Sequence, residues 1–113
     1  MEQRKDKRFD IRLYVKLKSG SKSSWGLLSD VSKNGLFVKS TQNFSKDAVI
    51  DIELFMPDNS VSILKGVVRR NVELPETHRK FGMGIEIIQK NEVYTKFLRS
   101  LGEQIKVPLQ TLS

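Results

Sequence analysis

The sequence has no cysteine and a single histidine, and each scarcity excludes a class of site. Without cysteine there is no disulfide framework, no zinc–thiolate site and no cysteine nucleophile, and one histidine excludes a histidine-rich metal site. No apolar run approaches the roughly 18 residues of a membrane-spanning helix, so we expect no membrane insertion. The N-terminal residues are too polar for a secretory signal. With 113 residues, 38% hydrophobic and 29% charged, one cytoplasmic globular domain is predicted.

Motifs that support catalysis are also missing. The sequence contains no phosphate-binding P-loop, no nucleophile elbow and no metalloprotease helix motif. Its one glycine pair, Gly82 and Gly84, falls inside a strand pattern, where glycine more often marks close backbone approach or a bend. His78 sits in a polar loop with no carboxylate beside it in the sequence. We therefore expect neither an enzyme nor a cofactor.

Positive charge is plentiful and unevenly placed. The net charge is +7 with a pI of about 9.8. Residues 1–22 contain eight Lys or Arg and three Asp or Glu, so most of the excess lies in the first fifth of the chain. A basic arm before a near-neutral body indicates an anionic partner bound near the N-terminus; a solvated tail that aids solubility is the alternative.

The body of the chain has the period-two alternation of β-strands. Strands are predicted at 13–18, 25–29 and 36–38, and a hairpin at 50–72 with its turn at 57–60. A last strand covers 81–88, with Met83, Ile85 and Ile87 on one face. About six short strands of similar spacing predict a small antiparallel barrel.

The periodicity changes to that of a helix after residue 90. Asn91 is a predicted N-cap, Glu92 lies in the first turn, and Pro108 is predicted to end the helix. The apolar stripe covers an open part of the barrel or forms a partner surface; it consists of Tyr94, Phe97, Leu98, Leu101 and Ile105. The predicted fold is therefore all-β, a six-stranded barrel with a C-terminal α-helix. Its parts are a flexible arm (1–9), the barrel (10–90), the helix (91–106) and a tail (107–113).

Two short motifs flank the first predicted strand. The first is RxxxR, formed by Arg4 and Arg8, and the second is DxSxxG, formed by Asp30, Ser32 and Gly35. Each is weak alone, since basic tails contain RxxxR by chance and DxSxxG is typical of many turns. In this order and at this spacing they resemble the PilZ family. The segments around residues 8–15, 67–69 and 81–87 also look like PilZ strands, so the resemblance covers roughly residues 2–90.

The resemblance implies a six-stranded antiparallel barrel that binds the bacterial second messenger cyclic di-GMP. Arg4 and Arg8 would grip a phosphate or the O6/N7 edge of guanine, which suits the planar guanidinium fork. Asp30 would accept hydrogen bonds from the N1–H and N2–H₂ donors of guanine. Ser32 would donate to a phosphate or base, and Gly35 would permit the turn. The arm would order when the nucleotide arrives.

Several further residues are secondary candidates for contact with the nucleotide. They are Gln3, Lys5, Arg12, Arg69 and Arg70, although ordinary surface charge explains the last two as well. Arg8 and Arg12 also form an RxxxR, so the register stays open. We favour Arg4 with Arg8, because the strand alternation begins directly after Arg8.

Aromatic residues could stack on a base, but in a small barrel they usually belong to the core. We expect Phe37 in the core and leave Trp25 undecided. The leading hypothesis is a cyclic di-GMP receptor, monomeric or weakly dimeric, that signals to an unidentified effector protein. The alternatives are a PilZ-like adaptor that binds protein without nucleotide, and a barrel for single-stranded nucleic acid. The nucleic-acid alternative is disfavoured because the arginines cluster at one end of the chain instead of alternating with aromatic residues along exposed strands.

Overall fold

The computed structural model describes residues 7–75 and 78–112, with the backbone alone for 103–112. These residues form six strands and one C-terminal helix, as the sequence predicted. The elements are β1 (Phe9–Ser19), β2 (Lys22–Val31), β3 (Gly35–Ser40), β4 (Val49–Phe55), β5 (Val61–Glu73), β6 (Phe81–Gln89) and α1 (Glu92–Leu112).

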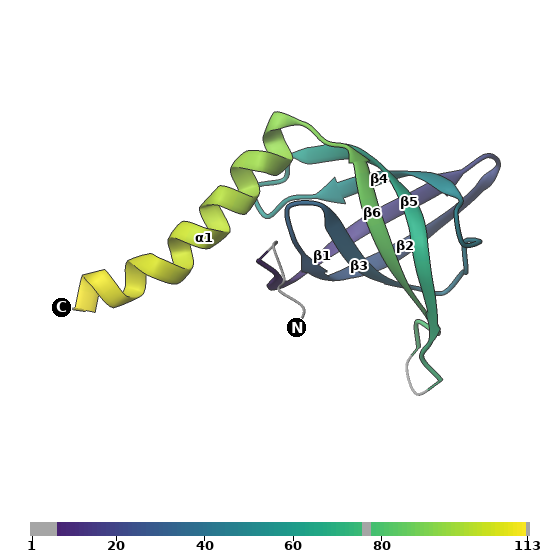
Figure 1. The fold of residues 1–113 in the computed structure, drawn as a ribbon, viewed down its shortest axis with the longest axis horizontal. Helices are drawn as coiled ribbons and strands as arrows, with labels where there is room; N and C mark the ends of the chain where they lie inside the picture. Colours follow the sequence, from purple (N-terminus) through teal and green to yellow (C-terminus); the bar gives the residue numbers. More distant parts are fainter. Residues whose placement is uncertain (1–6, 76–77, 113) are drawn as a thin grey trace, which may run out of the picture.

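The strands close into an antiparallel barrel in the order β1-β2-β3-β6-β5-β4 (Figure 1). The pairing of residues 15–18 of β1 with residues 51–54 of β4 completes the ring, so the sheet has no edge strand. The predicted barrel with a C-terminal helix is confirmed. No helix in the described part of the chain is both long and apolar enough to cross a bilayer.

Residues with a left-handed backbone lie in two hairpin turns, of which the turn at 57–60 was predicted. Gly20, with φ of 61°, opens the two-residue loop between β1 and β2, where the absence of a Cβ removes the steric cost. Asn59, with φ of 74°, lies in the turn between β4 and β5. The carboxylate of Asp58 accepts a hydrogen bond from the backbone N–H of Ser60 at 2.9 Å and fixes that turn.

The core is made by the inward-facing residues of all six strands and closed at both ends by aromatic side chains. Met83, Ile85 and Ile87 of β6 are buried, as their alternation predicted. Phe44, from the loop after β3, fills the end away from α1, and Tyr94 of α1 fills the other. The rest of the described helical stripe also packs on the core, so this part of α1 covers the barrel; these residues are Phe97, Leu98 and Leu101.

Two aromatic residues lie on the outside of the barrel. Phe37 was expected in the core, but it is only half-buried, because the alternation of β3 turns its neighbours Leu36 and Val38 inward instead. Trp25 is 55% exposed and stacks on Phe55 at 5.4 Å between ring centroids. The core prediction for Phe37 is therefore wrong, and Trp25 belongs to the surface.

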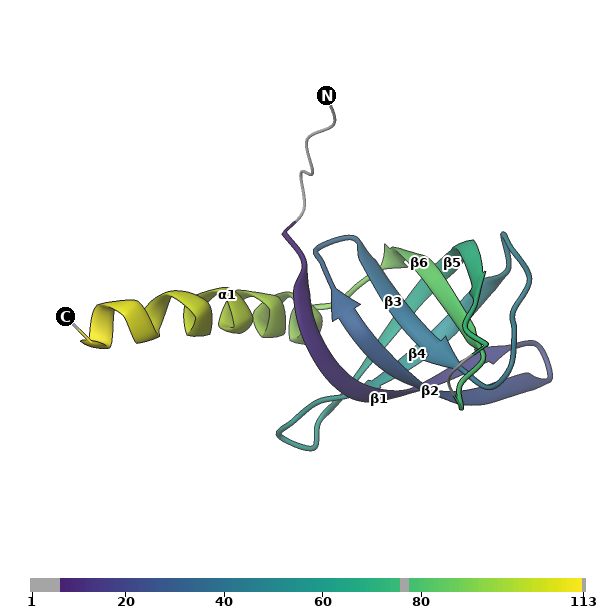
Figure 2. The same ribbon diagram turned by 90° about the horizontal axis from the view of Figure 1, so that it is seen from below.

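The helix is longer than the sequence predicted. It continues past Pro108 to Leu112. Proline removes one backbone donor from a helix, which is tolerated where water can bind the freed carbonyl. The C-terminal half of α1 projects away from the barrel in both views (Figures 1 and 2), so water has access to it.

Candidate functional site

A pocket of about 720 Å³ lies on the outer wall formed by β2, β3, β6 and β5. The described residues around it come from four segments that are far apart in the sequence, and closure of the barrel brings them together. Six of the residues singled out from the sequence line it, namely Arg8, Asp30, Ser32, Gly35, Arg69 and Arg70.

The floor of the pocket is a row of cross-strand partners. Asp30 of β2 pairs with Phe37 of β3, and Phe37 pairs in turn with Gly84 of β6. Gly84 pairs with Arg70 of β5. Because directly paired residues point to the same face of a sheet, the acid, the aromatic ring and the arginine share one outer surface.

A β-bulge turns Asp30 outward. Leu28 pairs with Val38, and the next pair joins Asp30 to Phe37, so Ser29 is an extra residue relative to β3. Strict alternation would place Asp30 on the same inner face as Leu28. The extra residue reverses the side, as bulges near binding sites often do, and the carboxylate reaches the pocket.

A second bulge does the same for Arg70. Val68 pairs with Ile85 and the next pair joins Arg70 to Gly84, which makes Arg69 the extra residue of β5. The side chain of Arg70 lies against Gly84, where an added Cβ would stand 3.6 Å from its Cβ and 3.7 Å from its Nε. Arg70 has no ion pair with any residue of the described ranges. Its charge is therefore available to an anion in the pocket.

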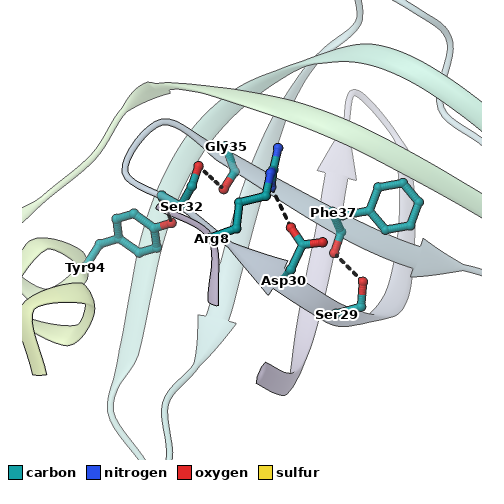
Figure 3. Close-up of polar contacts among 7 residues, drawn as sticks. All are labelled: Arg8, Ser29, Asp30, Ser32, Gly35, Phe37 and Tyr94. Carbon is teal, nitrogen blue, oxygen red and sulfur yellow. Dashed lines mark hydrogen bonds and ion pairs between the residues drawn. The ribbon is translucent and has the colours of Figure 1, made fainter. Parts of the chain in front are cut away.

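Arg8 and Asp30 contact each other directly. Arg8 Nη1 lies 2.6 Å from Asp30 Oδ1 (Figure 3), a short charge-assisted hydrogen bond. The side chains are 43% and 27% exposed, so the pair contributes little stability, about 0–1 kcal/mol. The contact uses one nitrogen and one oxygen, which leaves further guanidinium donors and the second carboxylate oxygen for a ligand.

The turn between β2 and β3 forms the edge of the pocket. The backbone N–H of Ser32 donates to the carbonyl oxygen of Gly35 at 2.9 Å, and the Ser32 hydroxyl donates to the same oxygen at 3.4 Å. At Gly35 an added Cβ would stand 3.3 Å from the carbonyl oxygen of Ile85, which is a tight approach. Ser32 is 3% exposed. In this structure its hydroxyl therefore supports the turn.

Tyr94 connects the helix to this turn. Its hydroxyl donates to the carbonyl oxygen of Ser32 at 2.6 Å (Figure 3). Burial raises the pKa of Tyr94 well above its ordinary value, while the charges of Arg8 and Asp30 have opposite smaller effects. Asn91 caps α1 by accepting from the Tyr94 backbone N–H at 3.0 Å, as the sequence predicted.

Arg69 also lines the pocket and already has partners. Its Nε lies 2.7 Å from Glu86 Oε1, and its Nη1 lies 3.5 Å from Asp47 Oδ1. The hydrogen bond to Glu86 raises the pKa of Arg69 above its ordinary value. Arg69 therefore has less free charge to offer a ligand than Arg70.

Of the remaining candidates, the structure describes Arg12 alone. Gln3, Arg4 and Lys5 lie outside the described residues. Arg12 is exposed on β1 and lines a separate depression on the other side of Asp30. Among the described residues, the arginine that meets Asp30 is thus Arg8.

Sequence reasoning missed Phe37, Gly84 and Tyr94 as parts of the site. The alternation of residues 36–38 could have placed Phe37 outside, opposite Gly84. Gly82 makes room for the Phe37 ring, because an added Cβ there would stand 2.6 Å from it. Tyr94 was assigned only to the apolar stripe, although a buried tyrosine hydroxyl needs a hydrogen-bond partner.

A sequence model of the PilZ domain matches residues 2–103. The chain belongs to the PilZ family. A comparison with curated protein sequences returns no match.

Solved structures share the PilZ fold at low sequence identity. The inhibitor of motility MotI/DgrA of Bacillus subtilis has a TM-score of 0.75 at 20% identity, over 97% of this chain and 53% of that one. The MrkH–c-di-GMP complex of K. pneumonia has a TM-score of 0.73 at 13% identity, over 100% and 56% of the two chains. This chain therefore spans about half the length of these two proteins.

This chain covers a third solved structure almost completely. The PilZ domain of YcgR from Escherichia coli, solved with c-di-GMP, has a TM-score of 0.70 at 12% identity, over 96% of this chain and 98% of that one. The match extends across the barrel and the helix, so the fold described above is that of a PilZ domain.

Proposed function

We propose that this chain is a cyclic di-GMP receptor and that the nucleotide binds in the pocket lined by Arg8, Asp30 and Arg70. The observation that carries the proposal is the meeting of Arg8 and Asp30 at 2.6 Å in a pocket of a PilZ barrel. Two of the structural relatives, MrkH and the YcgR PilZ domain, were solved with c-di-GMP.

The chemistry of the pocket suits a guanine nucleotide. The carboxylate of Asp30 can accept hydrogen bonds from the N1–H and N2–H₂ donors of guanine, which adenine does not present in that arrangement. Arg8 and Arg70 can bind phosphate oxygens or the O6/N7 edge of a guanine. The half-buried ring of Phe37 lies between Asp30 and Arg70 in the same row and offers an apolar surface for a base.

Arg4, the first arginine of RxxxR, is the second guanidinium of this motif that we expect to contact the nucleotide, beside that of Arg8. Arg4 lies outside the described residues, so this assignment rests on the sequence alone. Ordering of the arm over the nucleotide would change the surface that a partner protein meets. Ligand binding would then slow tryptic cleavage after Arg4 and Arg8, because both side chains would be engaged.

Titration calorimetry separates this proposal from its alternatives. Cyclic di-GMP, GTP and a short single-stranded oligonucleotide are each titrated into the protein at two salt concentrations. We expect saturation at micromolar or lower concentration by cyclic di-GMP alone. Tight binding of the oligonucleotide would support the nucleic-acid alternative, and no binding of any of them would support a protein adaptor.

A further inference from the structure

A second groove lies beside the turn between β2 and β3, separate from the nucleotide pocket. Its volume is about 460 Å³, and it runs between the residues before β1, this turn and α1. The described residues that line it are all different from those that line the first pocket. The groove is lined by Lys7, Phe9, Lys33, Lys90, Thr95, Leu98 and Arg99.

The charged residues that line this groove, among those the structure describes, are all basic. They are the four cations Lys7, Lys33, Lys90 and Arg99. None of them forms an ion pair with a residue of the ranges that the structure describes. Four like charges around one depression produce a positive potential that attracts an anionic partner.

The groove is held in shape by contacts with the protein backbone. Lys90 Nζ donates to the carbonyl oxygen of Lys33 at 2.7 Å and to Asn34 Oδ1 at 2.8 Å. These bonds hold the turn against the start of α1. The opposite wall is α1 itself, whose first turn is capped by Asn91 and held in the barrel by Tyr94.

The floor of the groove is apolar. Phe9 and Leu98 are half-buried and pack against the edge of the core, with part of each side chain facing the groove. A cluster of exposed lysines alone would suit any polyanion. An apolar floor between basic walls suits a peptide that offers carboxylates on its flanks and an apolar side chain at its centre.

We propose that this groove binds an acidic segment of a partner protein, with one apolar side chain seated on Phe9 and Leu98. The four cations attract a segment that is rich in carboxylates. The apolar side chain then fixes which part of that segment lies over Phe9 and Leu98. The proposal does not depend on nucleotide binding, because no described residue lines both depressions. Lys33 and Lys7 nevertheless belong to the two motif segments, so the groove lies where a bound nucleotide could alter it.

The test uses a fluorescein-labelled, glutamate-rich peptide with a central leucine, followed by fluorescence anisotropy. We expect saturable binding that weakens with added salt, and weaker binding when serine replaces the leucine. The double variant Lys33→Glu/Arg99→Glu should lose about tenfold or more in affinity, since each reversal replaces an attraction with a repulsion.

The matched control is Lys46→Glu/Lys80→Glu, which changes the net charge equally at exposed positions away from the groove. It should retain most of the binding, as should Arg70→Ala in the nucleotide pocket. Amide shifts in NMR spectra should concentrate at Thr95, Leu98 and Arg99. Circular dichroism checks that each variant folds.

Three results would overturn the proposal. The first is no binding of the peptide by the unaltered protein. The second is an equal loss in both charge-reversal variants, which would show attraction by net charge alone. The third is tighter binding of an oligonucleotide or an anionic phospholipid vesicle with the same dependence on Lys33 and Arg99, which would assign the groove to another class of partner.

Discussion

At the scale of single residues, Arg70 and Arg12 differ in whether they line the proposed nucleotide pocket. Arg70 lies against Gly84 on the floor of the pocket, and Arg12 lies on β1 outside it. Both were secondary candidates, and both registers of RxxxR were open from the sequence. Arg8 belongs to both registers, so its ion pair with Asp30 does not separate them. The position of Arg12 outside the pocket favours Arg4 with Arg8.

We predict that Arg70→Ala lowers the affinity for cyclic di-GMP by about tenfold to a hundredfold. The reason is that a hydrogen bond to a charged group is worth about 1.5–3 kcal/mol. Arg12→Ala removes the same charge outside the pocket and should change the affinity by less than about threefold. Calorimetry on both variants measures the difference. Equal losses would show that Arg70 acts only through the general positive field.

At the scale of elements, the strands and helix could be predicted from sequence, but the two bulges could not. The period-two pattern of residues 81–88 and the helical stripe around Phe97 reflect burial on one face, which is a local property. A bulge depends on how two strands are registered, and Ser29 and Arg69 become extra residues only relative to β3 and β6. The outward direction of Asp30 therefore required the structure, although its motif was visible.

The helix end was mispredicted for a related reason. Pro108 is a strong local signal to stop, but the projecting part of α1 is accessible to water, which can satisfy the freed carbonyl. Phe37 was misplaced because its size favoured the core, whereas the alternation of β3 decided its side. Tertiary placement prevailed over a local preference in both cases.

At the scale of the helix, Tyr94 should make the free energy of unfolding depend on pH. Burial raises its folded-state pKa above the unfolded value of about 10, so the neutral phenol stabilises the fold. This contribution is fully present below pH 10 and is lost as the pH rises above it, because the unfolded state then releases the proton more readily. Urea unfolding at neutral pH and above pH 10 measures the loss.

The variant Tyr94→Phe separates this effect from other alkaline changes. It cannot ionise, so the part of the alkaline loss due to Tyr94 should disappear. At neutral pH it should lower the free energy of unfolding by about 1–3 kcal/mol, because the carbonyl of Ser32 loses a buried donor. An alkaline loss that is identical in the variant and the unaltered protein would contradict the assignment to Tyr94.

At the scale of the whole molecule, whose net charge is +7, basic residues line two depressions on either side of one turn. Arg8 and Arg70 line the proposed nucleotide pocket, and Lys7, Lys33, Lys90 and Arg99 line the groove. Composition predicted an anionic partner. We propose that these depressions are two separate surfaces for anions, the first of which also contains the carboxylate of Asp30 for the recognition of guanine.

We predict that salt weakens the binding of cyclic di-GMP. The two phosphates of the ligand are attracted by exposed cations, and mobile ions screen such pairs. The dissociation constant should rise several-fold between about 50 mM and 500 mM NaCl. Arg70→Ala should show a shallower dependence in the same calorimetric series. A dissociation constant independent of salt would argue that phosphate contacts contribute little.

The most direct measurement is calorimetric titration of cyclic di-GMP into the unaltered protein, Arg8→Ala and Asp30→Ala. We expect saturation at micromolar or lower concentration for the unaltered protein and no detectable binding for either variant. Circular-dichroism spectra should stay unchanged, since the ion pair is half-exposed and contributes little stability. Unchanged affinity in both folded variants would contradict the central claim that the Arg8–Asp30 pair forms the nucleotide site.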